Sequence, residues 1–242
     1  MSYDVDHDYR LYIDGEWVPT ADHYDIVDPN TTQVVGRAPE ATVDQADDAA
    51  AAARAALAGW KRTPMAERCA LLAKAATLLS QRMPALVDLV QAETGSTINV
   101  AETMQVPICV ERFSHYASAV DLDMPLKPYA VGATALGPAG LQNAIVYHQP
   151  VGVVACIAPY NFPLTNIAGK IAPALAMGNT VIIKPAPQDP LAVVRFMEVL
   201  DEVGFPRGVV NLLIGSGPGA GSALVDSKLV NMISFTGSSV IG

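Results

Sequence analysis

Four stretches of the sequence place glycine, proline and isolated polar residues directly after apolar runs, and these stretches hold the residues best suited to chemistry. They are residues 158–163, 184–190, 215–221 and 236–242. In the first, Asn161 stands between two aromatic residues that are flanked by prolines, so a rigid turn could aim its amide N–H at a developing oxyanion. An asparagine that hydrogen-bonds only within its own turn is the alternative.

The other stretches hold groups that suit an anionic ligand. Lys184 ends an apolar run, where its ammonium could stand over a crevice or simply end a solvated strand. The glycines of 215–221 would let the backbone approach a pyrophosphate at a helix N-terminus. A glycine-rich turn without a ligand fits equally, since Ala220 takes the third place of a GxGxxG pattern. Residues 235–239 offer N–H and O–H donors to phosphate.

Cysteine and histidine give no sign of a nucleophile or a metal site. The three cysteines, Cys69, Cys109 and Cys156, are too few and too scattered for a disulfide framework, and we expect reduced, unreactive thiols. The four histidines are dispersed without an HxxxH or HExxH pattern, so we expect no metal role for them.

The composition favours a small ligand. A net charge of −9 and a pI near 4.8 argue against a nucleic-acid partner, because phosphate binding depends on Lys and Arg. The acidic start lacks an apolar stretch behind a basic flank, which predicts no targeting segment and a cytoplasmic location. The longest apolar runs fall short of the roughly 20 residues that span a bilayer, so no membrane segment is expected.

The elements that must position these residues fall into two patterns. In residues 1–123, Asp14-Gly15 predicts a hairpin and a Thr42/Gln45 capping box begins a helix that Gly59 should end. Thr63-Pro64 suits the N-cap and first position of a second helix. Further helical segments are expected over residues 86–93 and 111–119.

After Pro150, apolar strands alternate with helices. We expect strands over 151–157, 180–183, 209–213 and 231–235, and helices over 164–176, 191–203 and 220–225. This order predicts a parallel sheet covered on both faces, with ligands at the carboxyl ends of its strands. The Pro- and Gly-rich residues 124–140 should form a linker, followed by a strand over 142–149. The expected units are therefore 1–123, 124–149 and an incomplete 150–242.

Taken in order, the segments 158–164, 178–185, 208–221 and 233–239 closely resemble the aldehyde dehydrogenase superfamily. The resemblance extends to the amino-terminal region, through residues 14–17, 28–29 and 93–95, and covers essentially the whole chain. It implies a Rossmann-like α/β domain that binds NAD or NADP, a separate catalytic domain, and an oligomerisation strand within 142–149, hence a homo-oligomer.

The resemblance assigns roles residue by residue. It implies that Asn161 is the oxyanion-hole amide and that Lys184 contacts the adenosine ribose. The remaining cofactor residues that it implies are Ile157, Pro159 and Tyr160 in the groove wall, Gly217 and Gly221 beneath the adenine, and Phe235, Gly237, Ser238 and Ile241 around the pyrophosphate.

Two positions depart from the family pattern. Tyr160 replaces a common Trp and still supplies a flat wall. Pro187 replaces the Glu that accepts hydrogen bonds from the adenosine ribose hydroxyls in many NAD-preferring members. Without that carboxylate, a 2′-phosphate would meet less repulsion, and NADP use becomes plausible.

The family's general-base Glu and nucleophilic Cys lie downstream of the last motif in this sequence. We therefore expect the amino-terminal portion of a longer enzyme that oxidises an aldehyde through a cysteine thiohemiacetal, with this chain alone inactive. The alternative is a non-catalytic dinucleotide-binding or assembly fragment. An unrelated Rossmann dehydrogenase is disfavoured, because the Gly-rich loop follows the third strand of the unit and not the first.

Overall fold

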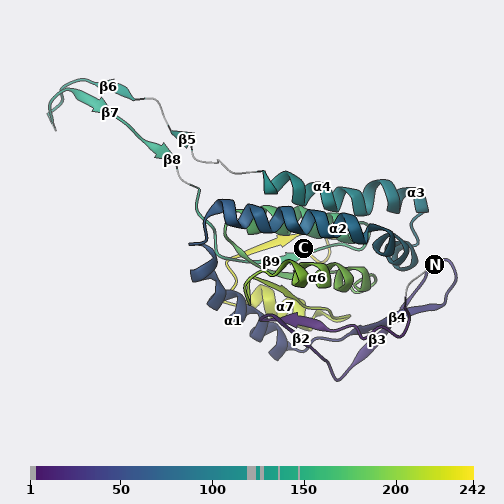
Figure 1. The fold of residues 1–242 in the computed structure, drawn as a ribbon. Coiled ribbons are helices and arrows are strands. Elements are labelled where there is room, and N and C mark those ends of the chain that lie inside the picture. Colours follow the sequence, from purple (N-terminus) through teal and green to yellow (C-terminus); the bar gives the residue numbers. More distant parts are fainter. Residues whose placement is uncertain (1–3, 119–123, 126–127, 136, 147) are drawn as a thin grey trace.

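A six-stranded sheet joins the beginning and the end of the chain (Figure 1). The computed structural model describes residues 4–118, 124–125, 128–135, 137–146 and 148–242. In spatial order the strands are β12 (Met232–Phe235), β9 (Val153–Ile157), β10 (Thr180–Lys184), β11 (Val210–Leu212), β1 (Leu11–Ile13) and β2 (Glu16–Val18). The first four run parallel, and the predicted hairpin β1–β2 adds two antiparallel strands beside β11.

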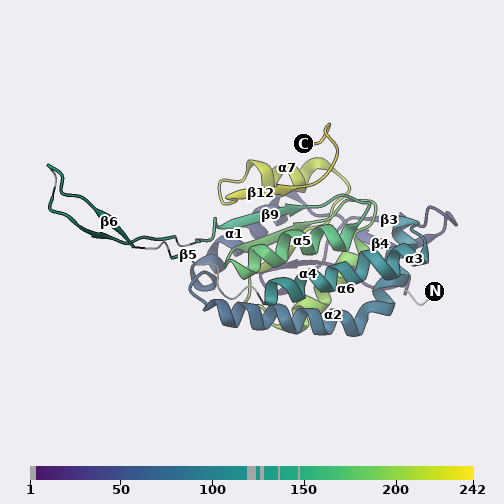
Figure 2. The same ribbon diagram turned by 90° about the horizontal axis from the view of Figure 1, so that it is seen from above.

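Helices cover both faces of this sheet, as predicted. Figure 2 shows α5 (Pro163–Ala176), α6 (Leu191–Val203) and the long α2 (Met65–Thr94) on one side and α7 (Pro218–Asp226) on the other. Helix α1 (Val43–Trp60) packs against α7 and β10. The apolar runs of β9 and β10 are buried because helices lie over both faces. The predicted Rossmann-like α/β class is confirmed.

The amino-terminal region is not separate from the sheet. Tyr12 of β1 pairs with Leu212 of β11, and one continuous hydrophobic core includes residues from both regions. As domain boundaries, 1–123 and 150–242 stay a prediction, but the described parts of these ranges share one core. The sequence pattern missed this, since a short hairpin carries no signal for its partner strand.

Two helix boundaries differ from the predictions. Gly59 does not end α1, which continues to Trp60, because the indole is buried and packs on Phe205 with 5.9 Å between ring centroids. Helix α2 begins after Pro64, so Pro64 and not Thr63 is the N-cap. The two segments expected on either side of Pro84 form one helix, because the buried apolar face continues across the proline.

The helix expected over 111–119 begins earlier and follows a distorted turn. The chain forms α3 (Ile98–Val100), the π-helix η1 (Ala101–Gln105) and then α4 (Val106–Ala117). Residue 119 lies outside the described residues. The earlier start is explained by the buried Val106 and Cys109, which lengthen the apolar face of the helix.

The described residues of the expected linker 124–140 belong to a projecting ribbon (Figure 1). Strand β5 (Met124–Pro125) pairs with β8 (Ile145–Val146), and β6 (Tyr129–Val131) pairs with β7 (Gly140–Gln142). The single strand expected over 142–149 was therefore wrong, because residues 143–144 interrupt it and residue 147 lies outside the described residues. A separate two-stranded sheet, β3 (His23–Val27) and β4 (Val34–Pro39), encloses the predicted turn at Asp28.

A buried carboxyl pair connects α2 to α6. The two carboxylate oxygens of Glu93 accept the N–H groups of Leu191 and Ala192 at 2.5 and 2.7 Å, which satisfies two donors at the start of α6. Asp189 lies nearby with 1% exposure, and neither of its oxygens has a hydrogen-bond partner in the described structure. Burial raises the pKa of Asp189 from 3.8 to about 8. Burial and the charge of Asp189 also raise the pKa of Glu93, against the effect of its two N–H donors. Asp189 has no donor and a raised pKa, so it is protonated at neutral pH.

The substitution Asp189→Asn tests whether Asp189 is protonated in the folded chain. Because the pKa of Asp189 is higher in the folded chain, its stabilising contribution is complete below its usual value of 3.8 and is lost as the pH rises toward 8. The variant lacks that loss, so its free energy of unfolding should fall less between pH 5 and pH 8, by about 1–3 kcal/mol. Urea unfolding at both pH values measures the difference. The exposed Asp47→Asn is the control, and equal slopes for both variants would contradict the assignment.

Candidate functional site at the carboxyl ends of the strands

The order of the strands creates a switch point between β9 and β12. From β9 the chain moves to β10 and β11 on one side and then returns to β12 on the other side of β9. In open α/β sheets, ligands bind in the crevice at such a point, beyond the carboxyl ends of the strands. The loops that flank it here are 158–162, after β9, and 236–242, after β12.

Three of the predicted cofactor residues form one row across the ends of these strands. Ile157 pairs in register with Lys184 of β10 on one side and with Phe235 of β12 on the other. Each is the last residue of its strand, so parallel pairing alone places the three side by side.

Lys184 presents a buried ammonium group between two loops. Its Nζ donates to the carbonyl oxygens of Pro185 and Gly215, both at 3.1 Å. Burial lowers the pKa of Lys184, and the charge of Glu40 acts in the opposite direction. Because an ammonium has three donors, these two bonds leave one for a ligand.

Glu40 joins this site from the amino-terminal region. Its Oε2 accepts the backbone N–H of Ser216 at 2.8 Å and the Ser216 hydroxyl at 2.6 Å, and Oε1 lies 3.5 Å from the N–H of Gly217. Burial raises the pKa of Glu40, but these hydrogen bonds and Lys184 outweigh burial and leave the pKa below its usual value. The first amides of the glycine-rich loop therefore face a carboxylate of the same chain.

Glu40 was missed in the sequence because no motif or spacing connects it to residues 215–221. The predicted glycines lie where expected: Gly217 is the N-cap of α7, and a Cβ on Gly221 would lie 3.8 Å from Cε of Lys184. The structure thus brings Lys184, Gly217, Gly221 and Glu40 together.

The loop after β9 presents Asn161 to solvent. Pro159 is half-buried, while Tyr160 is 62% exposed and Asn161 is exposed. The loop is held by Asn166 of α5, whose Nδ2 donates to the carbonyl oxygen of Phe162 at 2.9 Å. Among the described residues, no hydrogen bond engages the Asn161 amide, so this side chain does not serve its own turn.

The loop after β12 folds back over Phe235. A Cβ on Gly237 would lie 2.4 Å from Cζ of Phe235, so any larger residue there would have to displace the ring. The carbonyl oxygen of Ser238 accepts the N–H groups of Ile241, at 3.2 Å, and Gly242, at 3.1 Å. Ser238 and Ile241 are exposed at this turn.

Pro187 and Lys170 complete the surroundings. Pro187 is half-buried in the loop after β10 and offers no side-chain polar atom. Lys170 of α5, which the sequence did not single out, places its Nζ 2.8 Å from the Thr236 hydroxyl and 3.3 Å from the Ser234 hydroxyl. Burial lowers the pKa of Lys170. In the sequence, the signal that could have indicated Lys170 is a lysine within a largely apolar helical segment.

The three cysteines are buried free thiols, as expected. Burial raises the pKa of Cys109 and of Cys156 to about 12, so neither is a thiolate near neutral pH. Burial also raises the pKa of Cys69. Among the described residues, no group of three or more His, Cys, Asp or Glu side chains could hold a metal ion, and no helix could span a membrane.

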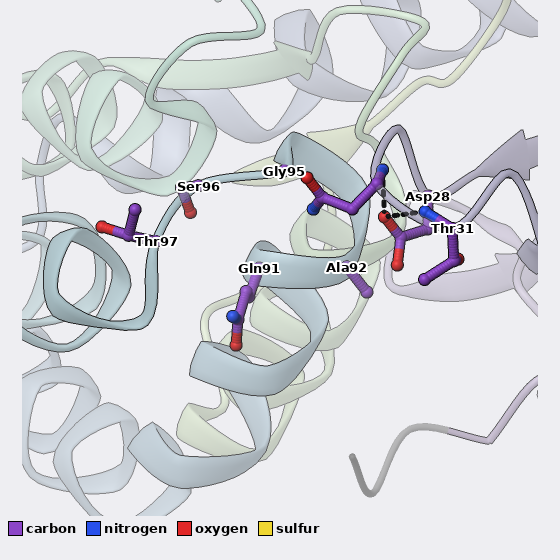
Figure 3. Close-up of a pocket in the computed structure, with 8 residues that line it drawn as sticks. Asp28, Thr31, Gln91, Ala92, Gly95, Ser96 and Thr97 are labelled. Carbon is purple, nitrogen blue, oxygen red and sulfur yellow. Dashed lines mark hydrogen bonds between the residues drawn. The ribbon is translucent and has the colours of Figure 1, made fainter.

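A pocket of about 350 Å³ lies away from the predicted site residues. Figure 3 shows it between the end of α2 and the turn at Asp28, with Gln91 and Thr97 among its lining residues. The Asp28 carboxylate is engaged by its own turn, since Oδ1 accepts the N–H of Asn30 at 2.7 Å. None of the predicted site residues lines this pocket.

Fold and loop geometry together define an α/β protein with a candidate ligand site at the switch point of a parallel sheet. The aldehyde dehydrogenase family model matches residues 17–242, and the chain belongs to this family.

Three similar proteins illustrate the match. A 2-aminomuconic semialdehyde dehydrogenase from Bos taurus is 36% identical over 94% of this chain and 45% of its own length. An alpha-ketoglutarate semialdehyde dehydrogenase from Haloferax volcanii is 37% identical over 96% of this chain and 47% of its own length. The NAD+ complex of an aldehyde dehydrogenase from Bacillus cereus is 32% identical with a TM-score of 0.86, covering 98% of this chain and 47% of that one. The chain thus spans about half the length of the curated relatives that it matches.

Proposed function

We propose that the intact protein oxidises an aldehyde to a carboxylic acid with NAD or NADP, and that this chain supplies the cofactor site and the Asn161 amide. The observation that carries the proposal is the row of Ile157, Lys184 and Phe235 at the switch point, beside a loop with a free asparagine amide. The unused N–H donor of Lys184 fits a ribose hydroxyl, and the exposed ring of Tyr160 offers a flat surface for one side of the cofactor groove. The bound nicotinamide would supply the hydride acceptor.

The oxyanion role of Asn161 is supported by the absence, among the described residues, of any hydrogen bond to its side-chain amide. A thiolate that adds to an aldehyde carbon leaves negative charge on the oxygen, and a preorganised N–H donor stabilises that charge. The Asn161 amide is exposed, and its loop is held by the bond between Asn166 and Phe162. The nucleophilic cysteine and the general-base glutamate would come from outside this chain, because its own thiols are buried.

The buried thiols also favour a second candidate, a non-catalytic dinucleotide-binding or assembly fragment. Fluorescence titration with NADH and NADPH, intact mass and an aldehyde oxidation assay on one sample distinguish the two. Cofactor binding without turnover by a protein of 25.4 kDa would favour the second candidate. Since two relatives are named for semialdehydes, the assay includes such substrates.

The projecting ribbon supports a homo-oligomer. Leu141, Ile145 and Val146 are 82%, 46% and 45% exposed there, and strands with exposed apolar side chains invite pairing with another chain.

Asn161→Ala should lower kcat for aldehyde oxidation by about 100- to 1,000-fold, because one oxyanion donor is lost. The dissociation constant for NADH should stay within about twofold of the unaltered value. Steady-state kinetics and fluorescence titration measure the two quantities. Asn99→Ala removes an exposed amide on α3 and serves as the control; an unchanged kcat in the Asn161 variant would refute the role.

Glu40 bears on cofactor choice. Although Pro187 removes the carboxylate expected beside the ribose, Glu40 places another one next to Lys184. We propose that this charge opposes a 2′-phosphate and favours NAD over NADP.

Glu40→Gln keeps an acceptor for Ser216 but removes the charge. The variant should bind NADPH more tightly relative to NADH by about 3- to 10-fold. Parallel fluorescence titrations give the ratio, with the exposed Glu67→Gln of α2 as the matched control. The proposal fails if both variants keep the unaltered ratio.

A further inference from the structure

Helix α5 carries one charged side chain, Lys170, and its amine reaches the strand ends at the switch point. The other residues of the helix are apolar or uncharged. The Lys170 Nζ lies 2.8 Å from the Thr236 hydroxyl and 3.3 Å from the Ser234 hydroxyl. The N–H of Thr236 donates to the carbonyl oxygen of Ile157 at 3.1 Å, which continues the pairing of β12 with β9 by one residue. The amine therefore lies at the carboxyl ends of these two strands.

The partners of Lys170 differ from those of other engaged lysines. In the part of the chain that the structure describes, no carboxylate forms an ion pair with it. Lys74 and Lys184 donate to backbone carbonyl oxygens, which only accept hydrogen bonds. Lys170 instead contacts two hydroxyl groups, which accept from an ammonium and can donate to the lone pair of a neutral amine.

The surroundings of Lys170 favour the neutral amine. Burial lowers the pKa of Lys170, and the charge of Cys156, which pairs in register with Ser234, acts in the opposite direction. A lysine that loses hydration without gaining a carboxylate partner holds more of the nucleophilic, neutral form near pH 7. Since Lys170 is half-buried and Thr236 is exposed, a small molecule from solution can reach the amine.

We propose that Lys170 is a carbonyl-reactive amine that binds small aldehydes covalently and reversibly as an imine. Its nitrogen lone pair adds to the carbonyl carbon, and one nitrogen proton passes to the carbonyl oxygen to give a carbinolamine. The hydroxyl group then leaves with the second nitrogen proton as water, and the C=N bond forms without oxidation or reduction. The Thr236 hydroxyl, 2.8 Å from Nζ, carries these protons.

This reaction is separate from the proposed oxidation, because imine formation needs neither a nicotinamide cofactor nor a thiolate. It gives the strand ends a second way to engage an aldehyde. An imine on Lys170 would lie beside Thr236 and compete with a ligand at the switch point. An aldehyde at high concentration would then inhibit the binding of that ligand reversibly.

The first test treats the purified protein with hexanal and cyanoborohydride, which reduces the imine to a stable secondary amine. Peptide mass spectrometry at pH 7 should show that Lys170 is alkylated at least about tenfold faster than the exposed Lys61. This preference should shrink as the pH approaches about 10, because exposed amines lose their protons there. The proposal is overturned if Lys170 reacts no faster than Lys61 at pH 7.

Substitutions of Thr236 test the proton carrier. Thr236→Val removes the hydroxyl at nearly constant shape and should slow the alkylation of Lys170 by about tenfold or more, while Lys61 is unaffected. Thr236→Ser should restore the rate. Thr77→Val, on the exposed face of α2, is the matched control, and thermal unfolding checks that each variant folds. Alkylation of the Thr236→Val variant at the unaltered rate would contradict the mechanism.

A binding measurement connects the imine to the switch point. Alkylation of the unaltered protein should weaken NADH binding in a fluorescence titration by at least about tenfold. The Lys170→Arg variant should bind NADH equally well before and after the same treatment. Equal losses in both proteins would overturn the competition at Lys170. Selective alkylation of Lys170 with unchanged NADH binding would support the reactive amine and count against the cofactor position in the proposed function.

Discussion

The parallel pairing of β9 on both of its edges is the constraint on which the rest of the structure depends. Two parallel neighbours require crossover helices, and the direction of those crossovers fixes which ends of the strands face the loops. Ile157, Lys184 and Phe235 meet because each ends its strand in the same register. Without that alignment, the loops that carry the glycines and the asparagine would not follow strand ends at the same edge of the sheet.

The site also depends on the amino-terminal region, which supplies its charge balance. The half-buried Glu40 compensates the charge of the buried Lys184 and engages the first amides of the glycine-rich loop. Buried charges are tolerated when they are paired and hydrogen-bonded. Glu93 has a comparable structural role at the start of α6, where it satisfies donors that the helix cannot satisfy itself.

The sequence predicted the regular elements well where one local signal decided them. Helix α6 matches its expected range of 191–203, and the capping box of Thr42 and Gln45 is present. The predictions fail where contacts between residues far apart in the sequence determine the bounds of an element. Burial of Trp60 extends α1 beyond Gly59, and the ribbon strands become recognisable only when 124–131 meets 140–146. For the site, motifs indicated Lys184 and Gly217, whereas Glu40 and Lys170 reach it only through tertiary folding, which no spacing reveals.

The hairpin β1–β2 has a consequence for the order in which the chain folds. Tyr12 pairs with Leu212, and both Tyr12 and Trp17 donate hydrogen bonds to Asp201, at 2.6 and 3.0 Å. During synthesis the first strands therefore emerge long before any of these partners exist. Such non-local pairing slows folding and leaves apolar strand edges open in the meantime. The nascent chain is thus most exposed to aggregation before β11 leaves the ribosome, and chaperone binding to its first residues would protect it during that interval.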